Sequence, residues 1–134
     1  MKNIEHIGIA VRDLGQAVSL YERLLGSPCY KTEEVPSEGV STAFFQVGEN
    51  KIELLAAIHN ESPIAGFLEK RGEGIHHIAF KVADILSEME RLKSEGFVLL
   101  NEVPKQGADQ KLVCFVHPKG TNGVLVELCQ DLVP

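Results

Sequence analysis

The chain contains an internal repeat, and this repeat constrains its fold more than any other feature of the sequence. The segment Ile4–Val11 (IEHIGIAV) recurs as Ile75–Val82 (IHHIAFKV), so that His77 lies 71 residues after His6. A single pair of matching histidines could arise by chance, but the apolar positions around them also match. Self-similarity over half a chain predicts two copies of one structural module.

A second pair of segments extends the repeat from histidine to glutamate. Lys51–Leu55 (KIELL) is matched by Leu125–Cys129 (LVELC), which places Glu127 at the position of Glu53, 74 residues later. Two histidines and two glutamates therefore occupy equivalent places in two similar halves.

Each half is predicted to form a strand, a helix and three more strands. One segment in each half has apolar residues at helical spacing, and the segments before and after it have the period-two alternation of strands. Asp13 and Asp84 precede the two helices as candidate caps, and Gly26 and Gly96 follow them. The predicted strands are 3–11, 27–35, 40–47 and 51–55 in the first half, and 75–82, 97–100, 112–117 and 124–128 in the second. The expected fold class is α+β, with two tandem βαβββ modules that pair into one domain.

We expect a single domain over residues 1–134, with module one at about 1–57 and module two at about 75–134. Ser62 is a candidate helix cap and Pro63 suits a first helical position, which predicts a linker helix at about 62–72. The longest irregular stretch, Asn101–Lys111, is a candidate binding loop that closes over a ligand.

Composition and charge narrow the class of partner. The 134 residues are 44% apolar and 24% charged, which is typical of a globular domain, and the net charge of −6 disfavours nucleic acid and anionic membranes. The chain has no basic leader before an apolar run and no apolar stretch of membrane-spanning length, so we expect a cytoplasmic protein without a membrane partner.

The cysteines argue against a thiol-based site. Cys29, Cys114 and Cys129 are odd in number and lack C-x-x-C spacing, so we expect neither a disulfide framework nor a thiolate zinc site. Cys114 and Cys129 lie in apolar runs and are expected to be buried packing residues.

Strand parity separates the two adjacent histidines of the second half. His77 shares a face with Ala79 and Lys81, whereas His76 shares the other face with Ile78 and Phe80. His77 is therefore the candidate ligand, and His76 is expected to pack on the helix side. Glu53 and Glu127 likewise lie between apolar neighbours in their strands. A carboxylate in such surroundings is costly unless it is paired or binds a metal.

The four repeated residues predict a metal site. Any one of them alone is more often an ordinary strand residue, but two imidazoles and two carboxylates suit a divalent ion of the first transition row: Zn²⁺, Mn²⁺, Co²⁺, Ni²⁺ or Fe²⁺. The candidate metal ligands are His6, Glu53, His77 and Glu127.

These residues also resemble a known family. The motifs HIGIAV, IELL, IHHIA and VLVEL, with a helix ending in LLG, resemble the vicinal oxygen chelate superfamily, whose paired βαβββ modules surround a divalent metal. The segments 62–79, 101–108 (NEVPKQGA) and 117–128 (HPKGTNGVLVEL) resemble most closely its methylmalonyl-CoA epimerase family. The resemblance covers almost the whole chain.

The resemblance implies a substrate and a reaction. The substrate would be an acyl-CoA whose α-proton lies between a thioester carbonyl and a carboxylate, and a metal that chelates both groups would stabilise the enolate. His6 and His77 match the family's metal histidines. Glu127 matches its C-terminal glutamate, which is both a metal ligand and an acid or base in catalysis.

The residue that transfers the second proton is not determined by the resemblance. Some family members carry a glutamate three residues after the glycine that corresponds to Gly39, and here that residue is Thr42. We expect Glu53 to supply or relay the second proton as a catalytic residue, and the alternative is a relay through water or Thr42.

Several basic residues are candidates for binding the substrate. Lys105 and Lys119, with Arg12, are candidates for the CoA phosphates or the substrate carboxylate, and Lys81 points to the same face as His77. Each is also consistent with an ordinary solvated surface charge. Thr42 is a further substrate-binding candidate, and the superfamily resemblance implies a homodimer.

Other functions share this pattern. A lactoylglutathione lyase would use the same four ligands on a hemithioacetal, whereas a ring-cleaving dioxygenase generally needs three ligands and Fe²⁺, and a thiol transferase is a further possibility on this fold. A metal-free module that binds a small ligand is the non-enzymatic alternative.

Overall fold

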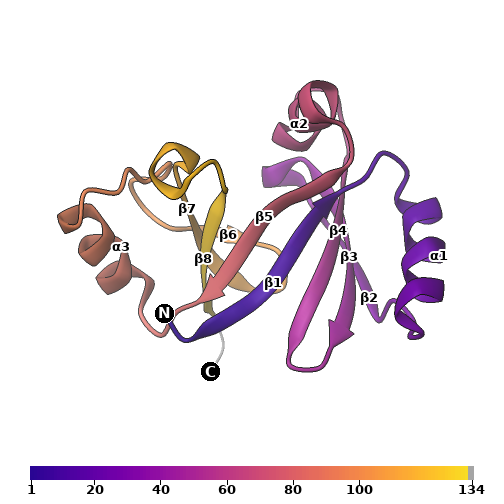
Figure 1. The fold of residues 1–134 in the computed structure, drawn as a ribbon, viewed down its shortest axis with the longest axis horizontal. Helices are drawn as coiled ribbons and strands as arrows, with labels where there is room; N and C mark the ends of the chain where they lie inside the picture. Colours follow the sequence, from indigo (N-terminus) through magenta and orange to yellow (C-terminus); the bar gives the residue numbers. More distant parts are fainter. Residues whose placement is uncertain (133–134) are drawn as a thin grey trace. The chain divides into compact units, whose positions relative to one another are not determined.

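The computed structural model describes residues 1–132, and the chain divides into two compact units (Figure 1). The first unit is His6–His76, and the second contains Met1–Glu5 together with the residues from His77 onward. The last two residues of the predicted second module, Val133 and Pro134, lie outside the described residues.

The elements follow the predicted order of strand, helix and three strands twice. The first run is β1 (Asn3–Ala10), α1 (Leu14–Leu25), β2 (Lys31–Val35), β3 (Val40–Val47) and β4 (Asn50–Ala57), and the linker helix is α2 (Pro63–Arg71). The second run is β5 (Gly74–Lys81), α3 (Ile85–Ser94), β6 (Lys105–Gly107), β7 (Lys111–Val116) and β8 (Val126–Asp131). Single 3-10 turns occupy Pro36–Glu38 and Pro118–Thr121. The prediction of an α+β fold with two βαβββ modules is confirmed.

In the first unit the strands lie in the order β2-β3-β4-β1. β3 is antiparallel to both neighbours, and β1 runs parallel to β4. α1 packs against β3 and β4 (Figure 1), with an apolar core of Val11, Ala17, Ala43, Phe45, Leu54 and Ala56 beneath it. Because strand side chains alternate, the intervening residues of β3 and β4 point to the face away from α1.

The predicted helix caps are present. The carboxylate of Asp13 accepts a hydrogen bond from the Gln16 N–H at 2.9 Å, and the hydroxyl of Ser62 accepts one from the Ala65 N–H at 3.1 Å. Gly26 ends α1 in the left-handed region at φ 70°, where a residue without Cβ is least strained. None of the described helices is long and apolar enough to cross a membrane.

In the second unit the strands lie in the order β5-β8-β7-β6, with β5 parallel to β8 and the other pairs antiparallel. α3 packs against β7 and β8 (Figure 1) and begins after Asp84, which accepts a hydrogen bond from the Ser87 N–H. The core under α3 contains Val82, Ile85, Met89, Leu92, Cys114, Val116 and Leu128. Cys114 and Cys129 are both buried, as predicted.

Two predicted strands are corrected. Residues 97–100 form no strand: their pairing with the end of β7 consists of one isolated bridge, between Leu99 and Val116, with hydrogen bonds from the Leu100 N–H to the Phe115 carbonyl and from the His117 N–H to the Val98 carbonyl. Phe97 and Leu99 pack against the α3 core. The additional strand is instead β6, within the stretch predicted to be irregular. The predicted strand 27–35 is also shorter, since β2 begins only at Lys31.

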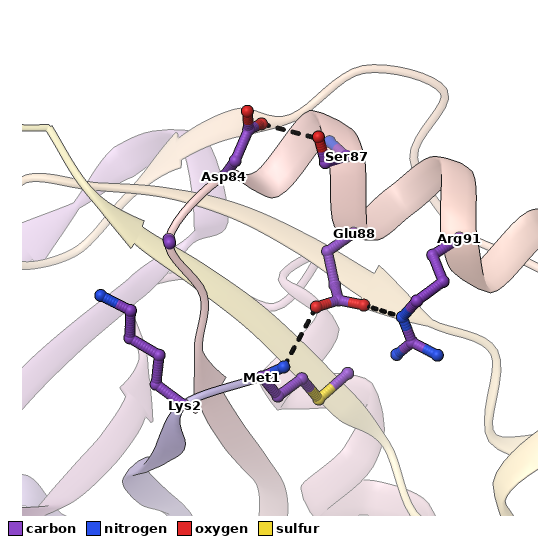
Figure 2. A pocket seen from close by; sticks show the side chains of 7 residues that line it. Met1, Lys2, Asp84, Ser87, Glu88 and Arg91 are labelled. Atoms are coloured by element: carbon purple, nitrogen blue, oxygen red, sulfur yellow. Dashed lines mark hydrogen bonds and ion pairs between the residues drawn. The ribbon is translucent and has the colours of Figure 1, made fainter.

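The N-terminal residues and α3 line a pocket within the second unit (Figure 2). Oε2 of Glu88 lies 3.1 Å from the amino group of Met1, and its other oxygen accepts a hydrogen bond from Arg91. The bond from Arg91 is the main reason that the pKa of Glu88 is below its usual range. The pocket contains none of the predicted site residues.

An ion pair between a buried lysine and a partly exposed aspartate lies at one end of the second sheet. Lys111 on β7 is buried and donates to Asp131, which lies directly opposite on β8. Lys81 also pairs with Asp131 at 3.2 Å, and a Glu5 oxygen lies 4.0 Å from the Lys111 ammonium. The hydrogen bond from Lys111 lowers the pKa of Asp131.

The first unit carries an apolar pair at the equivalent position. Under the 71- and 74-residue offsets, Val40 corresponds to Lys111 and Ala57 to Asp131, and these two residues also lie opposite each other on β3 and β4. The same position in the sheet therefore accepts either an ion pair or two small apolar side chains.

This comparison predicts the stability of three variants. Asp131→Ala should lower the free energy of unfolding by about 2 kcal/mol at neutral pH, because it leaves the buried Lys111 ammonium poorly compensated. The double variant Lys111→Val with Asp131→Ala should recover at least half of that loss, and Lys111→Val alone is the matched single variant. Urea unfolding measures all three.

The pKa of Asp131 is lowered in the folded state, so the loss of stability in Asp131→Ala should shrink as the pH falls below the usual carboxyl range. A double variant as unstable as Asp131→Ala would contradict the argument.

Candidate functional site

The first unit brings His6 and Glu53 into contact. β1 and β4 are parallel, and Gly8, two residues after His6, lies opposite Glu53. His6 Nδ1 is 3.1 Å from Glu53 Oε2, and the two residues are only 3% and 4% exposed. The unit thus buries an imidazole against a carboxylate on the face away from α1.

The second unit repeats this arrangement with His77 and Glu127. β5 and β8 are parallel, and Ala79, two residues after His77, lies opposite Glu127. His77 Nε2 is 3.5 Å from Glu127 Oε1, and the two residues are 5% and 7% exposed. All four predicted ligands are therefore buried, and each unit pairs its own histidine with its own glutamate.

A phenylalanine lies directly across the sheet from each glutamate. Phe44 on β3 is opposite Glu53, and Phe115 on β7 is opposite Glu127. The ring of Phe115 also meets the His77 imidazole edge-on, with 6.0 Å between centroids. Neither phenylalanine was predicted to be a site residue, because each looks in the sequence like an ordinary core residue. Phe44 and Phe115 are 71 residues apart, the same separation as His6 and His77. This shared offset is the signal in the sequence that could have identified the two phenylalanines as site residues.

A lysine ammonium lies near each of these rings. Lys31 Nζ lies 4.7 Å from the Phe44 centroid, and Lys105 Nζ lies 5.9 Å from the Phe115 centroid. Both distances are within the range of a cation–π contact. Lys105, a predicted substrate-binding residue, is therefore positioned beside the ring that borders Glu127, whereas Lys31 was not predicted.

The other predicted basic residues have different surroundings. Lys119 is exposed in the 3-10 turn Pro118–Thr121, where its N–H donates to His117 Nδ1 at 3.0 Å. The Arg12 guanidinium donates to the Leu68 carbonyl at 3.2 Å and thereby ties the segment after β1 to α2. Lys81 pairs with Asp131. The charges of Lys81 and Arg12 are thus engaged in contacts within the fold.

The packing role predicted for His76 is confirmed. Its ring meets Phe67 of α2 edge-on at 5.0 Å, and burial lowers the pKa of His76 to about 4. His76 is consequently neutral at physiological pH, and its neighbour His77 lies on the opposite face of β5 with the Glu127 contact.

Thr42 lies on β3, on the same face as Phe44 and away from α1. It is fully buried, and its hydroxyl has no hydrogen-bond partner among the described residues. It lies opposite Leu55, which is two residues after Glu53 on β4. Thr42 is thus a diagonal neighbour of Glu53 across the two strands.

The two His–Glu pairs fit the requirements of a divalent cation. Imidazole nitrogen and carboxylate oxygen are the usual ligands of Zn²⁺, Mn²⁺, Co²⁺ and Ni²⁺, and a buried carboxylate needs a positive partner. Each pair offers one nitrogen and one oxygen donor, already buried and in mutual contact.

Comparison with known proteins agrees with this architecture. Residues 5–115 match the model of the glyoxalase/bleomycin resistance protein/dioxygenase superfamily. The chain belongs to this superfamily. It is 46% identical over 129 residues to the ethylmalonyl-CoA/methylmalonyl-CoA epimerase of Cereibacter sphaeroides, with 95% of this chain and 96% of that protein covered.

Solved structures give the same relationship. A variant of Streptomyces coelicolor methylmalonyl-CoA epimerase in complex with 2-nitronate-propionyl-CoA matches with a TM-score of 0.95 at 32% identity, covering 99% of this chain and 96% of that one. A methylmalonyl-CoA epimerase in complex with methylmalonyl-CoA and NH4+ matches with the same values. The resemblance inferred from the sequence, and the fold that it implied, are confirmed.

The adjacent histidines of β5 provide a matched test of metal binding. His77→Gln should lower the affinity for a divalent metal at least about tenfold, because it removes a nitrogen ligand. His76→Gln should retain the wild-type affinity and stoichiometry while losing about 1 kcal/mol of stability with the Phe67 contact. Calorimetric titration with the metal measures the affinity and stoichiometry of each variant, and thermal unfolding measures its stability. Equal metal affinities in the two variants would exclude His77 as a ligand.

Proposed function

We propose that the chain is a methylmalonyl-CoA epimerase that depends on a divalent metal. The observation that carries the proposal is the duplicated contact of a buried histidine with a buried glutamate, once in each unit. The high identity to an ethylmalonyl-CoA/methylmalonyl-CoA epimerase over nearly the full chain supports this substrate rather than a hemithioacetal.

In this proposal the four side chains of the two pairs hold one cation. His6, His77, Glu53 and Glu127 each contribute one ligand atom, which leaves positions for substrate oxygens if the ion is six-coordinate. The cation, when bound, supplies the positive charge that stabilises the enolate formed when the α-proton leaves.

Two carboxylates would carry the proton transfers. Glu127 removes the α-proton from one face of the acyl group, and protonated Glu53 returns a proton to the opposite face; the reverse epimerisation exchanges these roles. Phe44 and Phe115 would border the two carboxylates and exclude water, because each lies directly opposite one of them. Lys105 and Lys119 would bind the anionic CoA portion.

A homodimer located in the cytoplasm is part of the same proposal; membership in the superfamily supports the dimer, and the globular composition is consistent with the cytoplasm. Light scattering coupled to size-exclusion chromatography would measure the oligomeric state. The identity of the metal would follow from elemental analysis of the protein as purified.

Exchange of the α-proton with solvent deuterium tests the reaction. Native protein should catalyse exchange and inversion at the α-carbon of methylmalonyl-CoA, and removal of metal with a chelator should abolish both activities. Glu127→Gln should reduce the rate by a factor of about 10² to 10⁴, the usual contribution of a general acid or base. Mass spectrometry and chiral analysis of the product follow the two events. Absence of exchange in fully metallated native protein would reject the proposal, and a hemithioacetal of glutathione would be the next substrate to assay.

Glu53→Gln tests the identity of the second base. This variant should keep a folded structure but lose turnover by about 10² or more, because the amide cannot exchange a proton. Exchange without inversion would show that Glu127 still removes the proton while return to the opposite face has failed. Wild-type turnover with wild-type metal content would instead favour a relay through water or Thr42.

A further inference from the structure

The hydroxyl of Thr42 is a buried polar group that the described part of the fold leaves without a hydrogen bond. Thr42 is 0% exposed, and Oγ1 has no partner among residues 1–132. An unsatisfied buried hydroxyl costs about 1–3 kcal/mol relative to a satisfied one. Buried polar groups in native proteins are nearly always paired, so this exception requires an explanation.

The second unit shows that the fold does not require a hydroxyl at this position. The residue equivalent to Thr42, 71 residues later, is Val113, which is also buried. Val113 lies opposite Cys129, two residues after Glu127, just as Thr42 lies opposite Leu55, two residues after Glu53. Valine has nearly the same shape as threonine and would avoid the cost of the buried hydroxyl.

The position of Thr42 connects the hydroxyl to the proposed reaction. Thr42 shares the face of the first sheet that carries His6 and Glu53, and its neighbour on the same face of β3 is Phe44. Glu53, when ionised, can only accept hydrogen bonds, and Phe44 offers no polar atom. Thr42 therefore adds a hydrogen-bond donor on β3, beside the carboxylate of Glu53 and the ring of Phe44.

We propose that the Thr42 hydroxyl donates a hydrogen bond to the free carboxylate of the bound acyl group. This inference rests on the proposed function. The carboxylate is the only anionic group of the acyl portion, and a hydrogen bond to a charged acceptor is roughly twice as strong as one to a neutral acceptor. The thioester oxygen offers no charge. Thr42 is thus a substrate-positioning residue that selects 2-carboxyacyl-CoA over simple acyl-CoA.

Binding measurements with two ligands test the inference. An equilibrated mixture of methylmalonyl-CoA epimers can be used with active enzyme, because epimerisation leaves its composition unchanged. Propionyl-CoA lacks the free carboxylate and serves as the comparison ligand. Isothermal calorimetry on metal-loaded protein gives both dissociation constants, and thermal unfolding of the ligand-free protein gives its stability.

Thr42→Val should weaken binding of methylmalonyl-CoA about tenfold, the value of one hydrogen bond to a charged group, and should change binding of propionyl-CoA by less than about twofold. The melting temperature of the ligand-free variant should be equal to or above that of the wild type. Thr42→Ser, which keeps the hydroxyl, should retain most of the wild-type preference for the carboxylated ligand. Thr32→Val, an exposed position on β2, is the matched control and should change neither affinity.

The outcomes separate this inference from the proposed function. If wild-type protein binds methylmalonyl-CoA and Thr42→Val binds it equally well, the inference is wrong while the function stands. An equal loss for both ligands would also overturn the assignment to the carboxylate, and a large fall in melting temperature would show a structural role instead. If the wild type binds neither ligand, the proposed function itself fails.

Discussion

The contact between a buried imidazole and a buried carboxylate is the interaction on which the rest of each unit depends. Removing a carboxylate from water is strongly unfavourable unless a positive or hydrogen-bonding partner compensates it. In each unit the partner is a histidine on the neighbouring parallel strand. The histidine lies two residues before the residue that is directly opposite the glutamate. A slip of one residue in either pair of strands would turn one member of the contact into the apolar core beneath α1 or α3. The register of the central strands and the chemistry of the site are therefore set by the same constraint.

Much of this arrangement was predictable from the sequence, because the decisive features repeat. The caps Asp13, Ser62 and Asp84, the strand Val40–Val47 and the facing of His77 away from His76 all follow from local patterns, and the structure confirms them. β6 was missed because Lys105–Gly107 has neither alternation nor β-branched residues, and its pairing with β7 makes it a strand. Residues 97–100 were predicted to form a strand because they are a short apolar run, and such a run does not distinguish a strand from an irregular segment that packs on the core.

The parts of the site that the sequence did not reveal are those that depend on pairing between strands. Phe44 and Phe115 look like core residues until the register places them opposite Glu53 and Glu127. The sequence also gives no sign that the Thr42 hydroxyl lacks a partner within residues 1–132, since threonine is common in strands and normally finds one. Local patterns thus predict which face a residue occupies, whereas its cross-strand neighbour requires the register.

The differences between the two halves carry as much information as their similarity. A duplicated scaffold explains why each half holds a histidine, a glutamate, a phenylalanine and a nearby lysine, but the substrate that we propose is not symmetric, since a thioester and a carboxylate flank its reacting carbon. Equivalent positions that differ in polarity are therefore where the two halves should specialise. Lys111 and Asp131 replace Val40 and Ala57 at the end of the sheet and serve stability, since they satisfy each other. Thr42 replaces Val113 beside the carboxylate and has no partner within the described fold, so its hydroxyl is better explained by a ligand than by packing.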